Sequence, residues 1–506
     1  MAESSDKMPD FKAGVSSDDV ADGMMLGGTF GEDGVLVARR GGRLFAVSSE
    51  CTHLGGPLPE GLMVSGEVRC PWHQARFSLE TGEAIAAPAL QPLGCYAVEE
   101  RDGKVFVTGK RERPAPAKTP KSPGRVVIVG GGAAGHACAD MLARHGFANQ
   151  VTVISEDADA PYDRTFCSKQ YLSGESERGE TDLDHNVVYK AGVTLNTGMR
   201  VTAIDLDGGT VATADGALPF DALVLATGAA PIRPEIPGFD KANVHLLRTL
   251  KDADALIASA VKAKRVAIVG ASFIGLEAAA AMIARKLEVT VIAPEPVPLA
   301  RILGEEAGRY VQGLHIDKGV AFRLGRKVEG FDGDALTLDD GSTVEADFVV
   351  LGVGVKPRLE LAEAAGLKLA DEKTGGVQVD ARLRTSAPDV YAVGDIAAYP
   401  DPRTGVIRVE HWAHAERQGQ HVARVLMGLA DAYETAPFFW TNHYDGGVGY
   451  IGHARKPDET KVDGKVASGA FAIEYYEDGK PAAMATSGRD IDGLRFDAAL
   501  EAGVAE

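Results

Sequence analysis

The chain has 506 residues, of which 45% are hydrophobic and 25% charged, and its formal net charge is −19. This length predicts about three or four domains of ordinary size. The acidity argues against a nucleic-acid partner, because phosphate binding needs a basic surface. We interpret it as a source of solubility, with steering of a basic partner protein as the alternative. No run approaches the roughly eighteen apolar residues of a membrane-spanning helix.

The compartment is predicted from the cysteines and the first residues. No Cys-x-x-Cys occurs, and an odd number of cysteines without a disulfide framework points to a reducing environment. Glu3, Asp6 and Asp10 stand where a signal peptide would need an apolar core. We therefore expect a cytoplasmic protein that needs no membrane. The cysteines are Cys51, Cys70, Cys95, Cys138 and Cys167.

Two pairs of metal-binding residue types stand near the N-terminus. Cys51-Thr52-His53 is followed by Cys70-Pro71-Trp72-His73. Two thiolates on one iron and two imidazoles on the other form the ligand set of a Rieske [2Fe–2S] centre. A Cys₂His₂ zinc site is the alternative, but zinc fingers place two Cys before two His, whereas each half here mixes them. A purely structural role is the third possibility, and we favour the iron–sulfur centre.

The region around these ligands has the pattern of a small all-β domain. Residues 1–25 form a polar lead-in, and short apolar runs follow within 26–109, at 35–38, 44–47 and 104–107. Short strands separated by Gly-rich turns predict a β domain. Residues 110–124 are basic and rich in proline, so we expect a semi-extended linker.

A dinucleotide-binding pattern begins after the linker. The continuous apolar run 126–129 is typical of a buried parallel strand, and Gly130, Gly132 and Gly135 follow it in G-x-G-x-x-G spacing. A helical stretch, a second strand at 151–154 and then Glu156 complete the unit. The glycines permit the turn, the approach of a pyrophosphate and helix packing, and Glu156 can accept from ribose hydroxyls.

The same pattern recurs downstream, which predicts a second dinucleotide. The strand 265–269 leads into Gly270, Ser272 and Gly275, and another strand follows at 289–292. Ser272 replaces the usual middle glycine, so the backbone should approach the ligand less closely. The acidic residue is delayed to Glu295, and no Arg directly follows the strand to pair with a 2′-phosphate. We therefore favour NAD over NADP.

Two further stretches fit a flavoenzyme. The run 223–228 ends in Thr227-Gly228, and the run 390–395 ends in Gly394-Asp395. A strand ending in Gly-Asp can direct the Asp395 carboxylate at a ribityl hydroxyl of FAD. An ordinary turn is the alternative interpretation of this dipeptide.

These features together resemble a known family. Residues from about 125 to 450 are similar to FAD/NAD-linked reductases of the glutathione-reductase-like fold, especially ferredoxin reductases of oxygenase systems and apoptosis-inducing-factor relatives. The similar motifs are the stretch 161–169, the helix start 273–277 and the dipeptide Phe439-Trp440. With the N-terminal β domain, almost the whole chain resembles Rieske-fused, apoptosis-inducing-factor-like oxidoreductases.

The resemblance implies a multidomain fold: an all-β Rieske domain, two α/β Rossmann-like domains and a C-terminal α+β domain. The expected boundaries are 26–109 for the Rieske domain, 125–245 with 359–434 for the FAD domain, 246–358 for the NAD domain, and 435–506 for the last domain.

The resemblance also implies residue roles. Lys169 and Glu277 would form a catalytic charge pair at the flavin and nicotinamide faces, where preorganised charge stabilises the reduced ring. A solvated surface charge is the alternative for each. The residues implied for FAD are Gly130, Gly132, Gly135, Glu156, Arg164, Lys169, Thr227, Gly228, Asp395 and Trp440. Those implied for NADH are Gly270, Ser272, Gly275, Glu295 and Gly354.

The implied function is electron transfer from NADH through FAD to the chain's own [2Fe–2S] cluster and on to a protein acceptor such as an oxygenase component. The protein is expected to be a monomer or a homodimer. Thr165 and Cys167 depart from the family motif, and Cys167 lies where peroxide- and disulfide-reducing relatives place a redox-active thiol. Peroxide or disulfide reduction at Cys167 is therefore one alternative function. A redox-sensing interaction protein that responds to NADH is another.

Three residues of the cluster loops also depart from high-potential Rieske proteins. Gly56 and Trp72 replace a loop-linking disulfide, and Ala75 replaces a serine that hydrogen-bonds a sulfide. Fewer hydrogen bonds to the sulfurs disfavour the reduced cluster, so we expect a potential near the low end of the Rieske range, roughly −150 mV.

Overall fold

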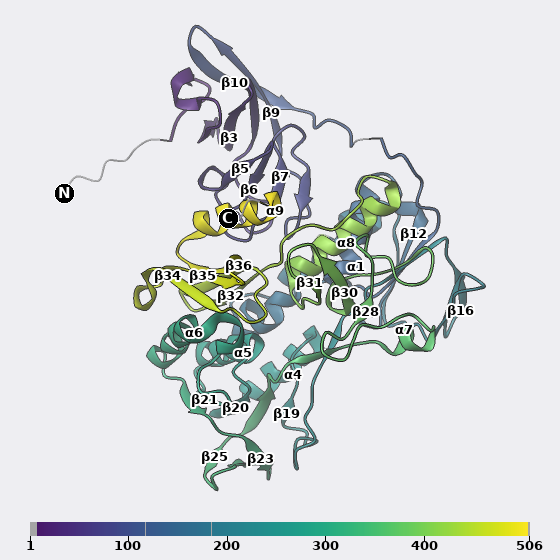
Figure 1. The fold of residues 1–506 in the computed structure, drawn as a ribbon, viewed down its shortest axis with the longest axis vertical. Coiled ribbons are helices and arrows are strands. Elements are labelled where there is room, and N and C mark those ends of the chain that lie inside the picture. Colours follow the sequence, from purple (N-terminus) through teal and green to yellow (C-terminus); the bar gives the residue numbers. More distant parts are fainter. Residues whose placement is uncertain (1–7, 117, 184, 504–506) are drawn as a thin grey trace, which may run out of the picture. The chain divides into compact units, whose positions relative to one another are not determined.

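The computed structural model describes residues 8–116, 118–183 and 185–503. Its contacts divide the chain into two compact units (Figure 1). The smaller unit takes in the described residues of Met1–Lys118 and Arg489–Ala505, and the larger unit spans Thr119–Gly488. Within the described ranges, no helix is both long enough and apolar enough to cross a membrane.

The N-terminal part of the smaller unit is all-β, as predicted. Its larger sheet is antiparallel, in the order β1-β10-β9-β4-β3-β2. The expected runs 35–38, 44–47 and 104–107 lie in β3, β4 and β10. Val35 and Leu36 are neighbours on β3 but belong to two different hydrophobic cores. This is because successive side chains of a strand point to opposite faces of the sheet. The strands are β1 (Val15–Ser16), β2 (Met25–Phe30), β3 (Asp33–Arg40), β4 (Arg43–Ser48), β9 (Cys95–Arg101) and β10 (Lys104–Arg111).

A second, four-stranded antiparallel sheet runs in the order β5-β6-β7-β8. Because β6 ends just before Cys70 and β7 begins at Arg76, the second Cys/His loop connects two paired strands. The first Cys/His loop leads into the short 3-10 helix η2 (Leu58–Glu60), and η1 (Ser17–Val20) lies earlier in the chain. The strands are β5 (Leu62–Val64), β6 (Glu67–Arg69), β7 (Arg76–Ser78) and β8 (Ala84–Ala86).

The last helix, α9 (Asp490–Ala502), belongs to the smaller unit (Figure 1). Arg69 Nη1 lies 2.5 Å from Asp497 Oδ2, and Arg76 Nη2 lies 2.9 Å from the same oxygen. Glu501 also contacts both guanidinium groups. The expected domain 435–506 is therefore divided, because buried ion pairs hold its last helix to the strands that flank Cys70 and His73.

The larger unit contains a five-stranded parallel sheet in the order β13-β12-β11-β17-β29. All four residues of β11 are buried, which explains its continuous apolar sequence. Strand β29 comes from far downstream, so this sheet combines residues from both sides of the second dinucleotide segment. Its strands are β11 (Val126–Val129), β12 (Val151–Ile154), β13 (Thr194–Asn196), β17 (Ala222–Leu225) and β29 (Val390–Ala392).

Helix α1 (Ala133–Arg144) follows β11 and packs against α8 (Trp412–Met427). The two backbones approach so closely that a Cβ on Gly419 would lie 2.0 Å from the Ala134 carbonyl oxygen. Several small elements surround this sheet. They are η3 (Ala148–Gln150), η4 (Arg164–Ser168), α2 (Gln170–Ser173), η5 (Arg178–Thr181), α3 (His185–Lys190), α7 (Glu360–Ala364), η6 (Gly394–Ile396), and the strands β14 (Ala203–Asp205), β15 (Thr210–Thr213), β16 (Gly216–Pro219), β18 (Ala229–Pro231), β27 (Val355–Pro357), β28 (Val377–Gln378), β30 (Ala397–Asp401) and β31 (Gly405–Ile407).

A second parallel sheet, in the order β19-β26-β20-β21-β22, forms the other predicted Rossmann-like layer. Helix α5 begins at Phe273, directly after the second glycine motif. The elements are β19 (Val244–His245), α4 (Leu250–Ala260), β20 (Arg265–Val269), α5 (Phe273–Ala284), β21 (Glu288–Ala293), α6 (Ala300–Asp317), β22 (Ala321–Leu324), β23 (Val328–Phe331), β24 (Ala335–Leu338), β25 (Thr343–Glu345) and β26 (Phe348–Leu351).

The last sheet of the larger unit is antiparallel, in the order β32-β33-β36-β35-β34. This sheet packs against α5 and α6 (Figure 1). The hydrophobic core that contains α5 also includes three aromatic residues of the sheet, Phe439, Tyr450 and Tyr475. Its elements are β32 (Phe438–His443), β33 (Gly446–Gly452), β34 (Glu459–Lys465), η7 (Val466–Ser468), β35 (Ala470–Glu477) and β36 (Lys480–Ser487).

Candidate functional site

The two Cys/His loops of the smaller unit have matching backbone hydrogen bonds. The N–H of Cys51 donates to the Gly56 carbonyl oxygen at 2.8 Å, and the N–H of Cys70 donates to the Ala75 carbonyl oxygen at 2.8 Å. Each loop therefore closes five residues after its cysteine. The loops also touch, because a Cβ on Gly56 would lie 2.6 Å from Cys70 Sγ.

The four predicted ligands meet as a pair of thiols and a pair of imidazoles. Cys51 and Cys70 are buried, with 3% and 1% of their surface exposed. A hydrogen bond between the thiols raises the pKa of Cys51 and lowers that of Cys70. His53 and His73 are half-buried, and their Nδ1 atoms lie 3.2 Å apart.

This pairing fits an iron–sulfur cluster better than a single metal ion. Among the described residues, no three or more His, Cys, Asp or Glu side chains converge on one ion. A Rieske cluster requires only two protein ligands on each of its two irons. The thiol pair lies inside and the imidazole pair lies toward the surface, so the donor set and its exposure fit that cluster.

The larger unit contains a cavity of about 1080 Å³ that begins at the first glycine motif. Gly130 has a φ of +114°, and a Cβ there would lie 2.1 Å from the Ala226 carbonyl oxygen. A Cβ on Gly135 would lie 1.9 Å from the Gly130 carbonyl oxygen, so helix α1 can pack only without a side chain there. Gly132 has open space, with its nearest neighbour, the Arg164 guanidinium, at 3.8 Å. The N-terminus of α1 is thus accessible to a diphosphate.

Most of the residues predicted for FAD line this cavity. They are Gly130, Gly132, Glu156, Arg164, Lys169, Thr227, Gly228, Asp395 and Trp440. Gly135 instead lies under the turn, where it is buried. The chain's own groups fit a flavin dinucleotide, because the cavity combines an open helix N-terminus with polar side chains along its length.

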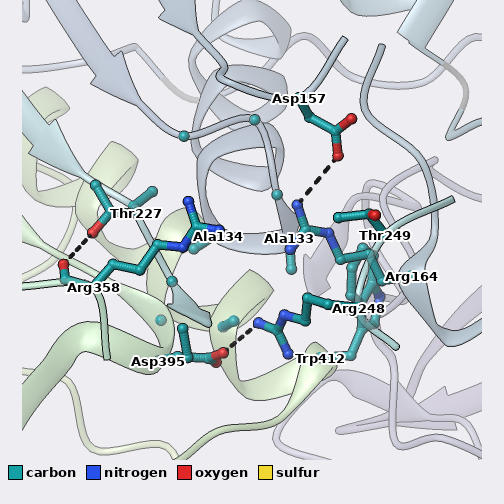
Figure 2. A pocket seen from close by; sticks show the side chains of 18 of the residues that line it. Ala133, Ala134, Asp157, Arg164, Thr227, Arg248, Thr249, Arg358, Asp395 and Trp412 are labelled. Carbon is teal, nitrogen blue, oxygen red and sulfur yellow. Dashed lines mark hydrogen bonds and ion pairs between the residues drawn. The ribbon is translucent and has the colours of Figure 1, made fainter. Parts of the chain in front are cut away.

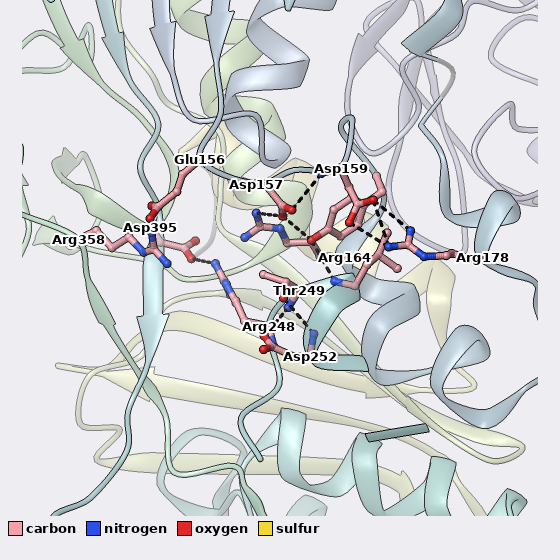
Figure 3. Close-up of polar contacts among 12 residues, drawn as sticks. Glu156, Asp157, Asp159, Arg164, Arg178, Arg248, Thr249, Asp252, Arg358 and Asp395 are labelled. Carbon is pink, nitrogen blue, oxygen red and sulfur yellow. Dashed lines mark hydrogen bonds and ion pairs between the residues drawn. The ribbon is translucent and has the colours of Figure 1, made fainter. Parts of the chain in front are cut away.

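Two carboxylates that were predicted to meet sugar hydroxyls pair with arginines. Glu156 lies 2.8 Å from Arg358 (Figure 3), and it lies 3.4 Å from Arg200. Asp395 Oδ2 lies 2.6 Å from Arg248 Nη2, and Figure 2 shows the Arg248 side chain pointing toward it. The second side-chain oxygen of Asp395 can accept from a ligand hydroxyl, whereas both oxygens of Glu156 already face arginines.

Thr227 and Arg164 are held by neighbours in the cavity wall (Figure 2). Thr227 Oγ1 donates to the Arg358 carbonyl oxygen at 3.0 Å. Arg164 lies 3.8 Å from Asp157, which also accepts from the Tyr162 hydroxyl at 2.8 Å. Arg164 is therefore oriented on the same side as the open glycine turn.

Lys169 and Glu277 come together, although one follows η4 and the other lies on α5. Lys169 Nζ is 3.1 Å from Glu277 Oε2, and both residues line the cavity. Glu277 is only 4% exposed, and it also accepts from Ser168 Oγ at 2.6 Å and from Thr441 Oγ1 at 2.9 Å. A buried carboxylate needs such partners, because an unpaired buried charge is costly.

Aromatic rings lie near this ion pair at the same end of the cavity. The His411 and Phe439 rings stack at 3.9 Å between centroids, and Phe273 packs edge-on against both. Burial lowers the pKa of His411 to about 4. Burial also raises the pKa of the neighbouring Glu410. This apolar end suits a planar ring system.

The residues predicted for NADH lie outside the lining of this cavity. Ser272 caps α5: its Oγ accepts from the Gly275 N–H at 3.2 Å and donates to the Gly352 carbonyl oxygen at 2.6 Å. Its side chain thus has a structural partner on each side. Gly270 and Gly275 make close backbone approaches like those of the first motif, whereas Gly354 has open space around it. Glu295 is exposed after β21.

Cys167 lines the cavity but is poorly suited to attack a substrate. Its exposed fraction is 2%, and burial raises the pKa of its thiol to about 12. The thiolate is the reactive form of cysteine, so the structure favours a small buried side chain at this position over a nucleophile.

Several cavity residues were missed by sequence reasoning, notably Arg248, Arg358, Asp157 and Arg178. Isolated arginines carry no local motif. The one available signal was the capping box from Thr249 to Asp252, which places Arg248 just before a helix start.

Comparison with known proteins identifies both units. Residues 124–419 match the model of the pyridine nucleotide-disulphide oxidoreductase family, and residues 12–97 match that of the Rieske [2Fe-2S] domain. Apoptosis-inducing factor 3 of Homo sapiens is 28% identical over 494 residues, covering 93% of this chain and 81% of that protein. Rhodocoxin reductase of Rhodococcus erythropolis is 35% identical over 362 residues, covering 69% and 82%.

A crystal structure of the covalent putidaredoxin reductase–putidaredoxin complex superposes with a TM-score of 0.71 at 30% identity, covering 76% of this chain and 94% of that one. The matches confirm the predicted cofactors: a [2Fe–2S] cluster, FAD and a nicotinamide dinucleotide. The chain is therefore a flavin- and NAD(P)H-dependent reductase of the ferredoxin reductase type with a Rieske domain, and it belongs to the pyridine nucleotide-disulphide oxidoreductase family.

Proposed function

We propose that the protein oxidises NADH at the large cavity and passes the electrons through FAD to its own Rieske cluster, from which an outside protein acceptor takes them. FAD, when bound, supplies the change from two-electron to one-electron transfer. The observation that carries the proposal is the Lys169–Glu277 ion pair in the wall of a cavity that starts at the Gly130–Gly132 turn.

The roles of the chain's own groups follow from their positions. The N-terminus of α1 and Arg164 would hold the diphosphate, because both offer donors beside Gly132. Asp395 would accept from a ribityl hydroxyl with the oxygen that Arg248 leaves available. Lys169 would bring positive charge to the site where negative charge develops, and Glu277 would fix its position.

The cluster ligands are proposed as Cys51 and Cys70 on one iron and His53 and His73 on the other. The half-buried imidazoles would give an acceptor access to the cluster. Gly56, Trp72 and Ala75 support a potential low in the Rieske range, since no side-chain hydroxyl stands at these three positions.

NADH is the proposed donor. The strand β21 ends without a following arginine, and Arg326, whose backbone reaches that end, already has partners. Its N–H donates to the Ala293 carbonyl oxygen at 3.1 Å, and its guanidinium lies 2.7 Å from Asp340. An arginine held in this way is a poor partner for a 2′-phosphate. Gly270, Ser272, Gly275, Glu295 and Gly354 are the proposed contacts for NADH.

The acceptor is proposed to be a protein, such as an oxygenase component, because two similar proteins are named as ferredoxin reductases of a dioxygenase system and of an O-demethylase. The chain's net charge of −19 would attract an acceptor with a basic face. None of the five cysteines forms a disulfide, which supports a reducing compartment such as the cytoplasm.

Anaerobic stopped-flow absorbance of the holoenzyme tests the proposal. NADH should bleach the flavin band first and the cluster band second. A Lys169→Met variant should slow flavin bleaching by about 10²-fold, because one preorganised charge is lost from the site. The exposed residue Lys262 offers a matched control. In the Lys262→Met variant the flavin should bleach at the wild-type rate.

A cluster that stays oxidised after complete flavin bleaching would contradict the route. Bleaching in Lys169→Met at the wild-type rate would contradict the role of the ion pair. Slow turnover with a long-lived complex of reduced protein and NAD⁺ would instead favour the redox-sensing alternative.

A further inference from the structure

A chain of hydrogen bonds leaves the cavity from the far side of Glu277. Oε2 of Glu277 faces Lys169, whereas Oε1 accepts from Thr441 Oγ1 at 2.9 Å. Thr441 Oγ1 is also 3.0 Å from His443 Nε2, at the end of the same strand, β32. The cavity carboxylate is thus connected to a histidine that does not line the cavity.

The chain continues onto helix α6 and then reaches the hairpin after β32. His443 Nδ1 lies 3.3 Å from His315 Nε2, and His315 Nδ1 lies 3.1 Å from the Tyr444 hydroxyl. Each histidine therefore uses one ring nitrogen toward Glu277 and the other toward Tyr444. We call this hydrogen-bonded series the Tyr444 chain; it consists of Thr441, His443, His315 and Tyr444.

The interior of the Tyr444 chain is fully buried and its outer end, Tyr444, is half-buried. Thr441, His443 and His315 are at most 1% exposed. Tyr444 is half-buried at the tip of the β32–β33 hairpin, beside the exposed residue Asp445. Its φ of +56° is unusual for a residue with a side chain, so the turn holds the ring against a backbone preference.

One set of proton positions satisfies every bond in the Tyr444 chain. An ionised carboxylate only accepts, so the Thr441 hydroxyl donates to Glu277 and its oxygen accepts from His443 Nε2–H. His443 Nδ1 then accepts from His315 Nε2–H, and His315 Nδ1 accepts from the Tyr444 hydroxyl. These tautomers follow from the hydrogen-bond network, and every proton in it points toward Glu277.

We propose that the Tyr444 chain is a proton relay that carries one proton from solvent to the Glu277 carboxylate when negative charge enters the cavity. The inference rests on the proposed function, which puts Lys169 and Glu277 beside the flavin. Each member passes on its own proton and receives one from the next member outward. The net change is one proton from water to Glu277 Oε1, and no electron moves along the chain.

The chemistry of the two histidines suits this role. A neutral imidazole accepts at one nitrogen and donates from the other. Burial lowers the pKa of both His315 and His443 to about 3, so neither stores the proton at neutral pH. The charged groups facing the chain are Lys169 at its inner end, and Lys318 and Asp445 at its outer end.

The alternative is that these buried groups only satisfy one another's hydrogen bonds, as most buried polar groups do. Two observations favour transport. The Tyr444 chain starts at an ion pair in the cavity and ends at a half-buried tyrosine beside the exposed residue Asp445, and the protons assigned to it share one direction. A cluster with a purely structural role requires neither property.

Proton uptake measured beside flavin bleaching distinguishes the two. Hydride transfer from NADH takes no proton from solvent, so at a pH high enough to keep the reduced flavin anionic, the uptake seen by a pH-indicator dye in weak buffer reports a protein group. In the anaerobic wild-type holoenzyme, uptake should keep pace with bleaching. Tyr444→Phe keeps the ring but removes the hydroxyl, so bleaching should be unchanged while uptake lags by about tenfold or more. His315→Gln keeps hydrogen-bonding groups without the two-sided imidazole and should show the same lag.

Tyr310→Phe is the matched control, because Tyr310 lies on the same helix as His315 and its hydroxyl contacts Ser487 instead of the chain. The relay proposal would be overturned if Tyr444→Phe took up protons at the wild-type rate, or if the wild-type protein took up no proton. Failure of NADH to bleach the flavin would instead count against the proposed function. Nitrogen-15 NMR of the oxidised holoenzyme then still tests the relay: both histidines should be Nε2–H tautomers, and an Nδ1–H tautomer at either would refute it.

Discussion

The Cys167 thiol lies in the cavity wall with 2% of its surface exposed, and burial raises its pKa to about 12. A thiol in this state is almost entirely protonated at neutral pH, whereas peroxide- and disulfide-reducing enzymes depend on thiolate. Cys167 packs with Tyr162 and Leu172 in the core of the larger unit. At the scale of this residue, packing explains the side chain better than catalysis does.

We therefore expect Cys167→Ser to leave NADH-dependent dye reduction within about twofold of wild type, since the thiol takes no part in the reaction. Any peroxide reduction should be equally unaffected. The variant should lose about 1–2 kcal/mol of stability, because a hydroxyl replaces a buried thiol. Steady-state assays with both acceptors check this, and selective loss of the peroxide assay would restore Cys167 as a nucleophile.

Single residues also show where prediction from sequence succeeds. Gly130 and Gly135 were predicted because their role is local: each lies within a few residues of the backbone it must accommodate. Arg248 and Arg358 were missed because they enter the cavity from other segments, and an isolated arginine resembles a surface charge. The pairing of Lys169 with Glu277 came from the family resemblance and not from any local pattern.

At the scale of elements, helix α9 is held to the smaller unit by charge. Asp497 is fully buried, and the guanidinium groups of Arg69 and Arg76 both contact it. Burial by itself lowers the pKa of Arg76. The negative charges of Asp497 and Glu501 raise that pKa by more, so its net shift is upward. These arginines directly flank the loop with Cys70 and His73, so α9 supports the backbone of a proposed cluster loop.

Asp497→Asn should therefore destabilise the smaller unit by up to about 3–5 kcal/mol, because two buried guanidinium groups lose the more deeply buried of the two carboxylates that they share, Glu501 being the other. Iron per chain and the unfolding midpoint, followed by cluster absorbance, should both fall. Glu305→Gln breaks an exposed ion pair with Arg309 on another helix and should change neither quantity. If Asp497→Asn retained full iron content and the wild-type midpoint, α9 would not support the loop.

The sequence could not assign α9 to the smaller unit. The contact between Arg69 and Asp497 spans 428 residues, and a helical stretch that follows a strand looks like part of the preceding domain. The strands and helices next to the glycine motifs were predicted because hydrophobic periodicity is local. The docking of a terminal helix depends on long-range charge pairing, which no local pattern records.

At the scale of the whole molecule, buried neutral histidines should make the larger unit sensitive to acid. Burial lowers the pKa of His411 to about 4 and of His315 and His443 to about 3, from an ordinary value of 6.5. The unfolded chain binds these protons below pH 6.5 and the folded chain does not. Stability is therefore fully present above pH 6.5 and falls as the pH drops toward 4.

Each such histidine should lower the free energy of unfolding by about 2 kcal/mol at pH 5 relative to neutral pH. Thermal unfolding of the holoenzyme at the two pH values measures the loss. His315→Gln removes one of these groups, so its loss of stability between neutral pH and pH 5 should be smaller by a comparable amount. An identical loss in the variant and the wild type would contradict the assignment.

The two units are joined by the chain at two places, between Lys118 and Thr119 and between Gly488 and Arg489. A covalent connection sets an effective concentration of one unit for the other that does not depend on the concentration of the protein. The central claim, that FAD reduces the cluster of the same chain, therefore has a kinetic signature that reduction between separate molecules lacks.

That signature is the dependence of cluster reduction on protein concentration. Holoenzyme mixed anaerobically with excess NADH should reduce its cluster with a first-order rate constant that stays unchanged over an about hundredfold dilution, as expected for an intramolecular step. A rate that falls in proportion to protein concentration would show that electrons reach the cluster from another molecule, and would contradict the account.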